Sequence, residues 1–197
     1  MDKNKIKNLI KSTMPLKLLN KIRFKRYMKF FTTNRDSYLV KKGYIKSFYQ
    51  SEPVDYLGNP VPWMNYSVVE FLNDRLNENL NMFEYGSGNS TIYFSSLVKY
   101  ITSIEYNIEW YNRIIGLLEK RENIRLIYQP LGEDYIHAIR NISKGENFYD
   151  VIIIDGRERV KCAKIAMRYL TKNGVLILDN SERERYKEIF LMYKDAG

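Results

Sequence analysis

The stretch MFEYGSGNST, residues 82–91, decides the fold that the rest of the chain builds. An apolar run ends at Glu84, glycines follow at Gly86 and Gly88, and the polar residues Asn89–Thr91 can cap a helix that begins after them. This order predicts a strand, a tight loop and a helix. Glycine has no side chain, so the loop can turn sharply and its backbone can lie against a ligand at the carboxyl end of the strand.

The acid before the two glycines indicates what kind of ligand the loop would meet. Glu84 is expected at the lip of the loop, whereas a phosphate-binding loop favours a helix N-terminus without an acid beside it. A carboxylate there favours a cationic ligand, and S-adenosylmethionine fits because it carries an ammonium and a sulfonium group. Many strand-to-helix turns use Gly-X-Gly only to change direction, so a plain turn is the alternative for this stretch alone.

After residue 80, apolar runs and helical patterns alternate regularly. Asp150–Ile154 contains the run Val-Ile-Ile-Ile, typical of a strand covered by helices on both faces. The alternation predicts an α/β fold with a doubly wound, mainly parallel sheet and helices on both faces. The predicted strands are Asn81–Tyr85, Tyr100–Ile104, Ile124–Tyr128, Asp150–Ile154 and Gly174–Leu178; the predicted helices are Trp63–Leu76, Ser90–Val98, Asn107–Arg121, Gly132–Ile142, Glu158–Leu170 and 181–194.

Charge and turn residues divide the chain into three predicted parts. Residues 1–50 hold 14 Lys and Arg against two Asp, whereas the whole chain has a net charge of only +9. The parts are a basic helical extension (residues 1–50), a linker rich in proline and glycine (51–62) and the main domain (63–197). The chain has one cysteine, which excludes a disulfide framework. Without a predicted signal peptide or membrane span, we expect a cytoplasmic protein.

The basic extension has two interpretations. Apolar residues recur at helical spacing among lysines and arginines from Lys3 to Phe31, and Pro15 is expected to separate two helices. The basic surface of these helices could bind anionic lipid head groups at a membrane surface or the phosphates of RNA. Alternatively, the helices pack their apolar stripe on the main domain and leave their lysines in water.

Polar residues follow the second and third predicted strands. Glu105 lies 21 residues after Glu84, a spacing that suits a carboxylate accepting hydrogen bonds from the ribose hydroxyls of a nucleoside cofactor. The alternative is a solvated acid at a strand end. Residues 129–134 would border the adenine, with Leu131 packed on the ring and with Glu133, Asp134 or a backbone amide reading the edge of the ring.

Two acids and an amide follow the fourth and fifth strands. Asp155 and Asp179 are the candidate catalytic residues, since they would meet near the methyl group to be transferred. With Asn180 they supply three oxygen ligands that would suit Mg²⁺, which could activate a substrate hydroxyl. Alternatively, Asp155 only orients the cofactor or substrate, while Asp179 and Asn180 cap the next helix.

Four segments together resemble the successive motifs of Rossmann-like S-adenosylmethionine-dependent methyltransferases: Phe83–Thr91, Ser103–Glu105, Tyr149–Arg157 and Gly174–Ser181. The sequences IDGRER and LDNSER are similar to those of bacterial O-methyltransferases linked to surface-polysaccharide synthesis. The set Asp155, Asp179 and Asn180 is similar to the magnesium triad of catechol-type O-methyltransferases. The resemblance implies methyl transfer to a hydroxyl of a small molecule or saccharide. It also implies this cofactor-binding set: Glu84, Tyr85, Gly86, Ser87, Gly88, Ser90, Thr91, Glu105, Leu131, Gly132 and Asp155.

The chain also departs from that family. The family sheet normally ends in an antiparallel hairpin, and nothing after residues 181–194 can supply one, so we expect a truncated product or a second chain over the edge of the fifth strand. The alternative functions are RNA methylation, motivated by the basic extension, and a non-catalytic module that binds the cofactor or a membrane. A nicotinamide dehydrogenase fits less well, because Thr91 replaces the third glycine of a dinucleotide-binding loop.

Overall fold

The computed structural model describes residues 14–118 and 121–194. The chain divides into two compact units, residues 1–59 and residues 60–197, which are described separately here. The division falls inside the turn-rich range 51–62 of the sequence analysis. In the described part of the chain, no helix has both the length and the apolar character that crossing a membrane requires.

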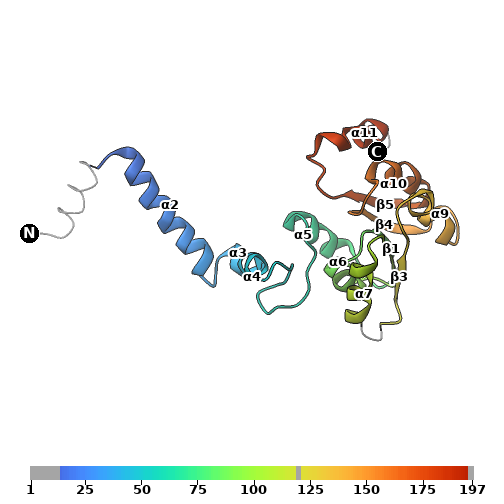
Figure 1. The fold of residues 1–197 in the computed structure, drawn as a ribbon, viewed down its shortest axis with the longest axis horizontal. Helices are drawn as coiled ribbons and strands as arrows, with labels where there is room; N and C mark the ends of the chain where they lie inside the picture. Colours follow the sequence, from blue (N-terminus) through green and yellow to red (C-terminus); the bar gives the residue numbers. More distant parts are fainter. Residues whose placement is uncertain (1–13, 119–120, 195–197) are drawn as a thin grey trace, which may run out of the picture. The chain divides into compact units, whose positions relative to one another are not determined.

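The first unit is helical. It consists of α2 (Leu16–Thr33), α3 (Tyr38–Lys41) and α4 (Tyr44–Gln50), and Figure 1 draws α2 as the long blue helix. Pro15 is the residue before the first turn of α2, where the missing N–H of proline costs no hydrogen bond. The helix predicted before Pro15 lies outside the described residues. None of the residues of α2 is buried.

The second unit is built on a five-stranded parallel sheet with the strand order β3-β2-β1-β4-β5 (Figure 1). The predicted strands are confirmed, although β5 begins four residues earlier than expected and its pairing with β4 is irregular near Tyr149. β1 pairs with both β2 and β4, so the loop after β1 lies at the middle of the sheet. The strands are β1 (Asn81–Tyr85), β2 (Tyr100–Glu105), β3 (Ile124–Tyr128), β4 (Tyr149–Ile154) and β5 (Leu170–Leu178).

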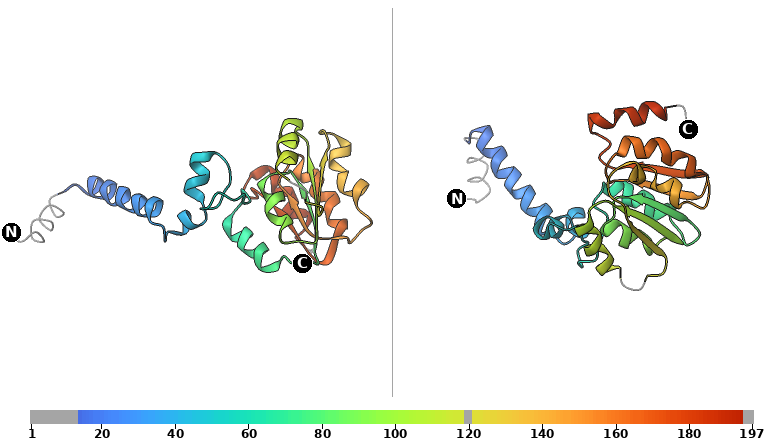
Figure 2. Two further views of the ribbon diagram at one scale, coloured as in Figure 1. Left: turned by 90° about the horizontal axis from the view of Figure 1, so that it is seen from below. Right: turned by 45° about the vertical axis from the view of Figure 1, so that its right-hand side comes forward.

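Helices cover both faces of this sheet (Figure 2). Alternate residues of a strand point to opposite faces, so Phe83 and Tyr85 join one apolar cluster and Met82 joins the other. The first face is covered by α8 (Glu133–Ile136), α9 (Ala138–Ile142), α10 (Arg159–Ala166) with the 3₁₀ turn η1 (Met167–Tyr169), and α11 (Lys187–Met192) after the turn η2 (Glu184–Tyr186). The second face is covered by α5 (Tyr66–Arg75), α6 (Asn89–Ser95) and α7 (Ile108–Leu117).

Two local predictions are wrong. Residues 89–91 form the first turn of α6 instead of capping it, and Gly88 is the residue before the helix. The single helix expected over residues 132–142 is two short helices joined at His137. The buried hydroxyl of Tyr85 lies at this break, where it donates to the carbonyl oxygen of Ile136 at 2.9 Å and accepts from the N–H of Ile139 at 3.4 Å.

Candidate functional site

The loop between β1 and α6 begins at Gly86, which has a φ of 95°. Its N–H donates to the carbonyl oxygen of Ile104 at 2.9 Å, which continues the pairing of β1 with β2 past the end of the strand. A Cβ at this position would lie 2.8 Å from the backbone nitrogen of Gly156, which begins the loop after β4. Only glycine satisfies both the positive φ and the close approach of the two loops. The predicted tight turn is therefore present.

Glu84 does not lie at the lip of the loop, and this prediction is wrong. Its side chain is fully buried and accepts hydrogen bonds from the hydroxyl groups of Ser90, Thr91 and Ser103. Burial raises the pKa of Glu84 to about 7 against the opposing effect of these three donors. Ser90 and Thr91 therefore serve the buried carboxyl group, and they fix the first turn of α6 to the sheet.

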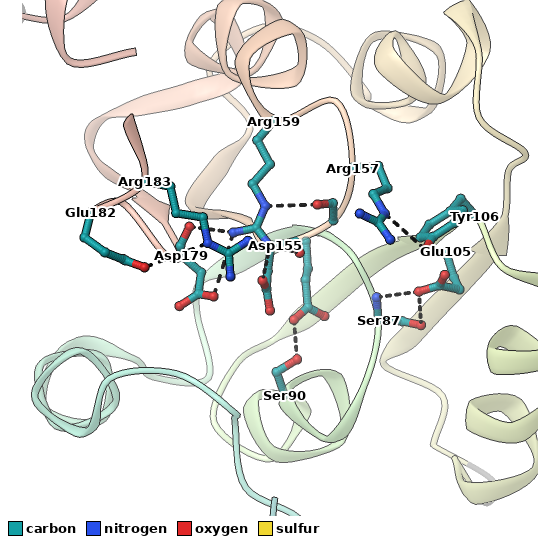
Figure 3. A network of polar contacts seen from close by, with 12 residues as sticks. Ser87, Ser90, Glu105, Tyr106, Asp155, Arg157, Arg159, Asp179, Glu182 and Arg183 are labelled. Atoms are coloured by element: carbon teal, nitrogen blue, oxygen red, sulfur yellow. Dashed lines mark hydrogen bonds and ion pairs between the residues drawn. The ribbon is translucent and has the colours of Figure 1, made fainter. Parts of the chain in front are cut away.

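Glu105 ends β2 and lies beside the loop that carries Gly86, as Figure 3 shows. One carboxylate oxygen accepts from both the N–H and the hydroxyl group of Ser87, at 3.1 and 3.2 Å. The other accepts from the N–H of Asn107 at 2.8 Å. A carboxylate has about four acceptor positions, so Glu105 can hold the glycine loop and still accept a hydrogen bond from a ligand.

A cavity of about 890 Å³ opens at the carboxyl ends of the strands. Its wall includes Gly86, Ser87, Glu105, Leu131 and Asp155, which the sequence predicted as ligand contacts. Ligand sites in doubly wound sheets lie at this end, and this volume falls in the range of small-molecule pockets. The structure thus brings the loops after β1, β2, β3 and β4 around one space.

The sequence analysis missed the aromatic part of this wall. Trp110, on α7, donates its indole N–H to the carbonyl oxygen of Ser87 at 2.7 Å and lines the cavity. Tyr106 also lines it and accepts a hydrogen bond from Nε of Arg157 at 3.1 Å. Their nearness to the glycine loop in space depends on how α7 and β4 pack, which no local pattern of the sequence contains.

Arg159 links the two candidate catalytic acids (Figure 3). Its Nη2 donates to a carboxylate oxygen of Asp155 at 2.7 Å, and its Nη1 lies 3.8 Å from a carboxylate oxygen of Asp179. It also donates to the backbone carbonyl oxygens of Asp155, Gly156 and Asp179. Burial, and then the charge of Asp179, raise the pKa of Asp155 to about 7, while Arg159 opposes this shift.

These residues do not fit the predicted magnesium site. The guanidinium group of Arg159 supplies the positive charge between Asp155 and Asp179, where a metal ion would have to lie. Asn180 has a left-handed backbone (φ 52°) and lines a different cavity from Asp155. Among the described residues, no group of three or more His, Cys, Asp or Glu side chains could hold a metal ion. The arrangement is an arginine-bridged acid pair.

A second cavity of about 380 Å³ adjoins the end of β5. Asp179, Asn180, Ser181 and Glu182 line one side. The other side comes from the start of α5 and the residues before it, including Trp63, whose side chain is 64% exposed. Asp179 therefore contacts Arg159 on one side and borders this second cavity on the other.

Three further predicted ligand contacts are not part of the wall of the large cavity. The side chain of Tyr85 is buried in the core on the α8–α9 side of the sheet, because the residue before the loop faces away from the cavity. Gly88 and Gly132 are each the residue before a helix, α6 and α8, and neither is part of the cavity wall. Tyr85 as a side-chain contact is therefore wrong.

Solved structures of methyltransferases have a similar fold. A methyltransferase-like protein from Silicibacter pomeroyi is 24% identical, with a TM-score of 0.56 over 68% of this chain and 80% of that one. Precorrin-6y C5,15-methyltransferase from Geobacter metallireducens is 21% identical, with a TM-score of 0.53 over 66% and 68%. SMU.1697c from Streptococcus mutans, solved in complex with SAH, is 17% identical, with a TM-score of 0.53 over 70% and 84%.

No model of a protein family and no curated protein sequence matches the chain. At these identities the structural likeness shows the fold: the chain has the Rossmann-like α/β fold found in methyltransferases, and the predicted fold class is confirmed.

Proposed function

We propose that this chain is an S-adenosylmethionine-dependent methyltransferase that methylates a hydroxyl group of a small-molecule or saccharide acceptor. The observation that carries the proposal is the large cavity at the carboxyl ends of the strands, where the glycine loop, Glu105 and Asp155 form one wall. The likeness to SMU.1697c, which was solved with SAH, supports the same cofactor class. S-adenosylmethionine, when bound, supplies a methyl group on a sulfonium sulfur for in-line attack by a nucleophile.

The residues of the cavity suit the parts of this cofactor. Glu105 has acceptor capacity left for ribose hydroxyls after it has bound the loop at Ser87. Leu131, half exposed at the cavity wall, offers an apolar surface for the adenine ring. Asp155 places a carboxyl group on the same cavity wall as Gly86, where it would face the cationic sulfur or amino group of a bound cofactor.

Asp155 is the proposed base. A general base works best when its pKa is near the working pH, and burial has raised the pKa of Asp155 to about 7. In its ionised form the carboxylate can accept the proton of an acceptor hydroxyl while the oxygen attacks the methyl carbon. Arg159 holds one of its oxygens at 2.7 Å, and this contact orients the carboxyl group at the cavity wall.

The second cavity supports a saccharide or a similar polyhydroxy acceptor. Trp63 offers an exposed aromatic face, on which the apolar face of a sugar ring can pack. Asp179, Asn180 and Glu182 on the opposite side provide acceptors and a donor for hydroxyl groups. An acceptor bound there would lie next to the arginine-bridged acid pair.

Isothermal titration of the full chain with S-adenosylmethionine tests the cofactor. We expect saturable binding that weakens at least about tenfold in Glu105→Ala, since both a ligand contact and the anchor of the loop are lost. Glu109→Ala is the matched control, because Glu109 lies in the first turn of the neighbouring α7 outside the cavity wall and should leave the affinity unchanged. Absence of binding at millimolar cofactor would refute the proposal.

Methyl transfer itself is tested with methyl-labelled cofactor and a saccharide extract. Label that resists mild alkali excludes a methyl ester, and an O-methyl sugar found after acid hydrolysis identifies the ether that O-methylation of a hydroxyl produces. A chain that binds the cofactor but labels no saccharide, no small hydroxyl compound and no RNA would be the non-catalytic module.

A further inference from the structure

The helix α2 carries an unusual combination of charge and apolar surface. Its 18 residues include six lysines and arginines and no acid. None of these residues is buried, although eight large apolar or aromatic side chains belong to the helix and are exposed. Within the described part of the chain, no ion pair involves a cation of α2. The helix thus presents both a strong positive charge and a large apolar surface.

Four of the six cations and four of the eight exposed apolar side chains follow different stripes. Lys17, Lys21, Lys25 and Lys29 are each four residues apart, so they line one side of the helix. Leu16, Phe24, Tyr27 and Phe31 are separated by eight, three and four residues, so they line the adjacent side. The rings of Phe24 and Tyr27 are 65% and 63% exposed. An aromatic face thus lies beside a lysine face.

This arrangement does not stabilise a helix in water by itself. Lysines at i and i+4 repel one another, and a helix with no buried residue gains nothing from tertiary packing. An anionic surface would remove the repulsion, and an apolar boundary beneath it would take up the aromatic rings. A bilayer that contains anionic lipid offers both at the same depth.

We propose that α2 docks on the surface of an anionic lipid bilayer, lying in the plane of the membrane. The face of Leu16, Phe24, Tyr27 and Phe31 enters the boundary between head groups and acyl chains, and the lysine face meets the lipid phosphates. Leu18 and Ile22 lie among the lysines, whose long stems extend past them to the phosphates. Asn20 and Arg23 also fall on the side of Leu16 and Tyr27, and the long stem of Arg23 lets its guanidinium group extend to the phosphates.

The aliphatic residues favour lipid over nucleic acid. Phosphates of RNA would be met by the cations alone, and aromatic rings could stack on bases. Leu16, Leu18, Ile22 and Met28 are also exposed on this helix, however, and a nucleic acid offers such side chains no apolar environment. The inference is independent of the proposed methyl transfer, since it rests on a separate unit of the chain.

Co-sedimentation of the full chain with vesicles tests the proposal. We expect binding to vesicles of phosphatidylcholine with about 30% phosphatidylglycerol, weakened at least about tenfold by 0.5 M salt, and little binding to pure phosphatidylcholine. The lysine variant replaces residues 17, 21, 25 and 29 by glutamine and should weaken binding on the order of 1,000-fold. The aromatic variant, which combines Phe24→Ser, Tyr27→Ser and Phe31→Ser, should also fail to sediment with the anionic vesicles.

A charge-matched control separates the effect of the lysine face of α2 from the effect of the overall charge of the protein. It replaces the same number of exposed lysines in the other unit by glutamine: Lys99, Lys144, Lys172 and Lys194. This control should keep full binding, and all variants should keep the cofactor affinity of the parent chain. The proposal is overturned if the control loses as much binding as the lysine variant, if the aromatic variant binds like the parent, or if a single-stranded RNA probe binds while anionic vesicles do not.

Discussion

Replacing Arg159 by methionine should destabilise the second unit by about 3 kcal/mol at pH 8, because it leaves two neighbouring carboxylates without their cation. The Arg159 side chain is 8% exposed and donates to Gly156, Asp155 and Asp179. Breaking a buried pair by removing one partner costs about 3–5 kcal/mol. We take the lower end because the Asp155 side chain is 31% exposed, so water screens part of its charge.

The measurement is urea unfolding followed by tryptophan fluorescence, with Arg157→Met as the control. Arg157 lies two residues away, is exposed and has a side-chain hydrogen bond to Tyr106, so its loss should cost less than about 1 kcal/mol. Without Arg159 the pKa of Asp155 rises further above that of an unfolded aspartate. In the folded variant Asp155 then keeps its proton to higher pH than in the unfolded chain, so the free energy of unfolding of the variant falls as pH rises. The loss of stability relative to the parent chain is therefore larger at pH 8 than at pH 5.5.

Adding Asp179→Asn to Arg159→Met should restore part of the lost stability, because one of the two unpaired charges disappears. If Arg159→Met costs no more than Arg157→Met at pH 8, the guanidinium does not hold the acid pair together, and the argument against a metal at this place fails with it.

Two other predictions follow from the raised pKa values. Asp179→Asn removes the negative charge next to Asp155, so the pKa of Asp155 should fall below about 7. The increase of the proposed methyl-transfer rate with pH, which reports ionisation of the base, should then occur at lower pH. An unchanged pH–rate profile would mean that Asp155 is not the base. For Glu84, burial raises the pKa from 4.5 to about 7, so the folded state keeps a proton that the unfolded state has lost. Its contribution to the free energy of unfolding should decline by about 3 kcal/mol as pH rises through this window, and urea unfolding of Glu84→Gln between pH 5 and pH 8 should lack that part of the decline.

The sheet was predictable because its signals are local. Val151–Ile154 is a continuous apolar run, and all four residues are fully buried between the two helical layers. Gly86 was predictable for the same reason, since a strand end followed by Gly-X-Gly needs a positive φ and a close backbone approach. Glu105 also follows from its place at the end of β2, and it lines the cavity.

The place of Glu84 was not predictable from its neighbours in the sequence. An acid near the end of a strand is normally expected at the surface, and the glycine pattern placed Glu84 at the lip of the loop, facing a cationic ligand. Its burial depends on three hydroxyl donors, two from the first turn of α6 and one, Ser103, from β2. Ser103 is brought opposite Glu84 by the parallel register of the two strands, which is a property of the folded sheet.

The error at the acid pair has a physical cause. Convergence of Asp155 and Asp179 at the ends of adjacent strands was correctly expected, and a positive charge between two close carboxylates stabilises their ionised forms. A metal ion is one source of that charge. Arg159 is another, and it comes one turn after Asp155, where the start of α10 returns its side chain over the end of the sheet. Wherever strand-end acids converge in such folds, the cations of the following helix therefore have to be placed before a metal is inferred.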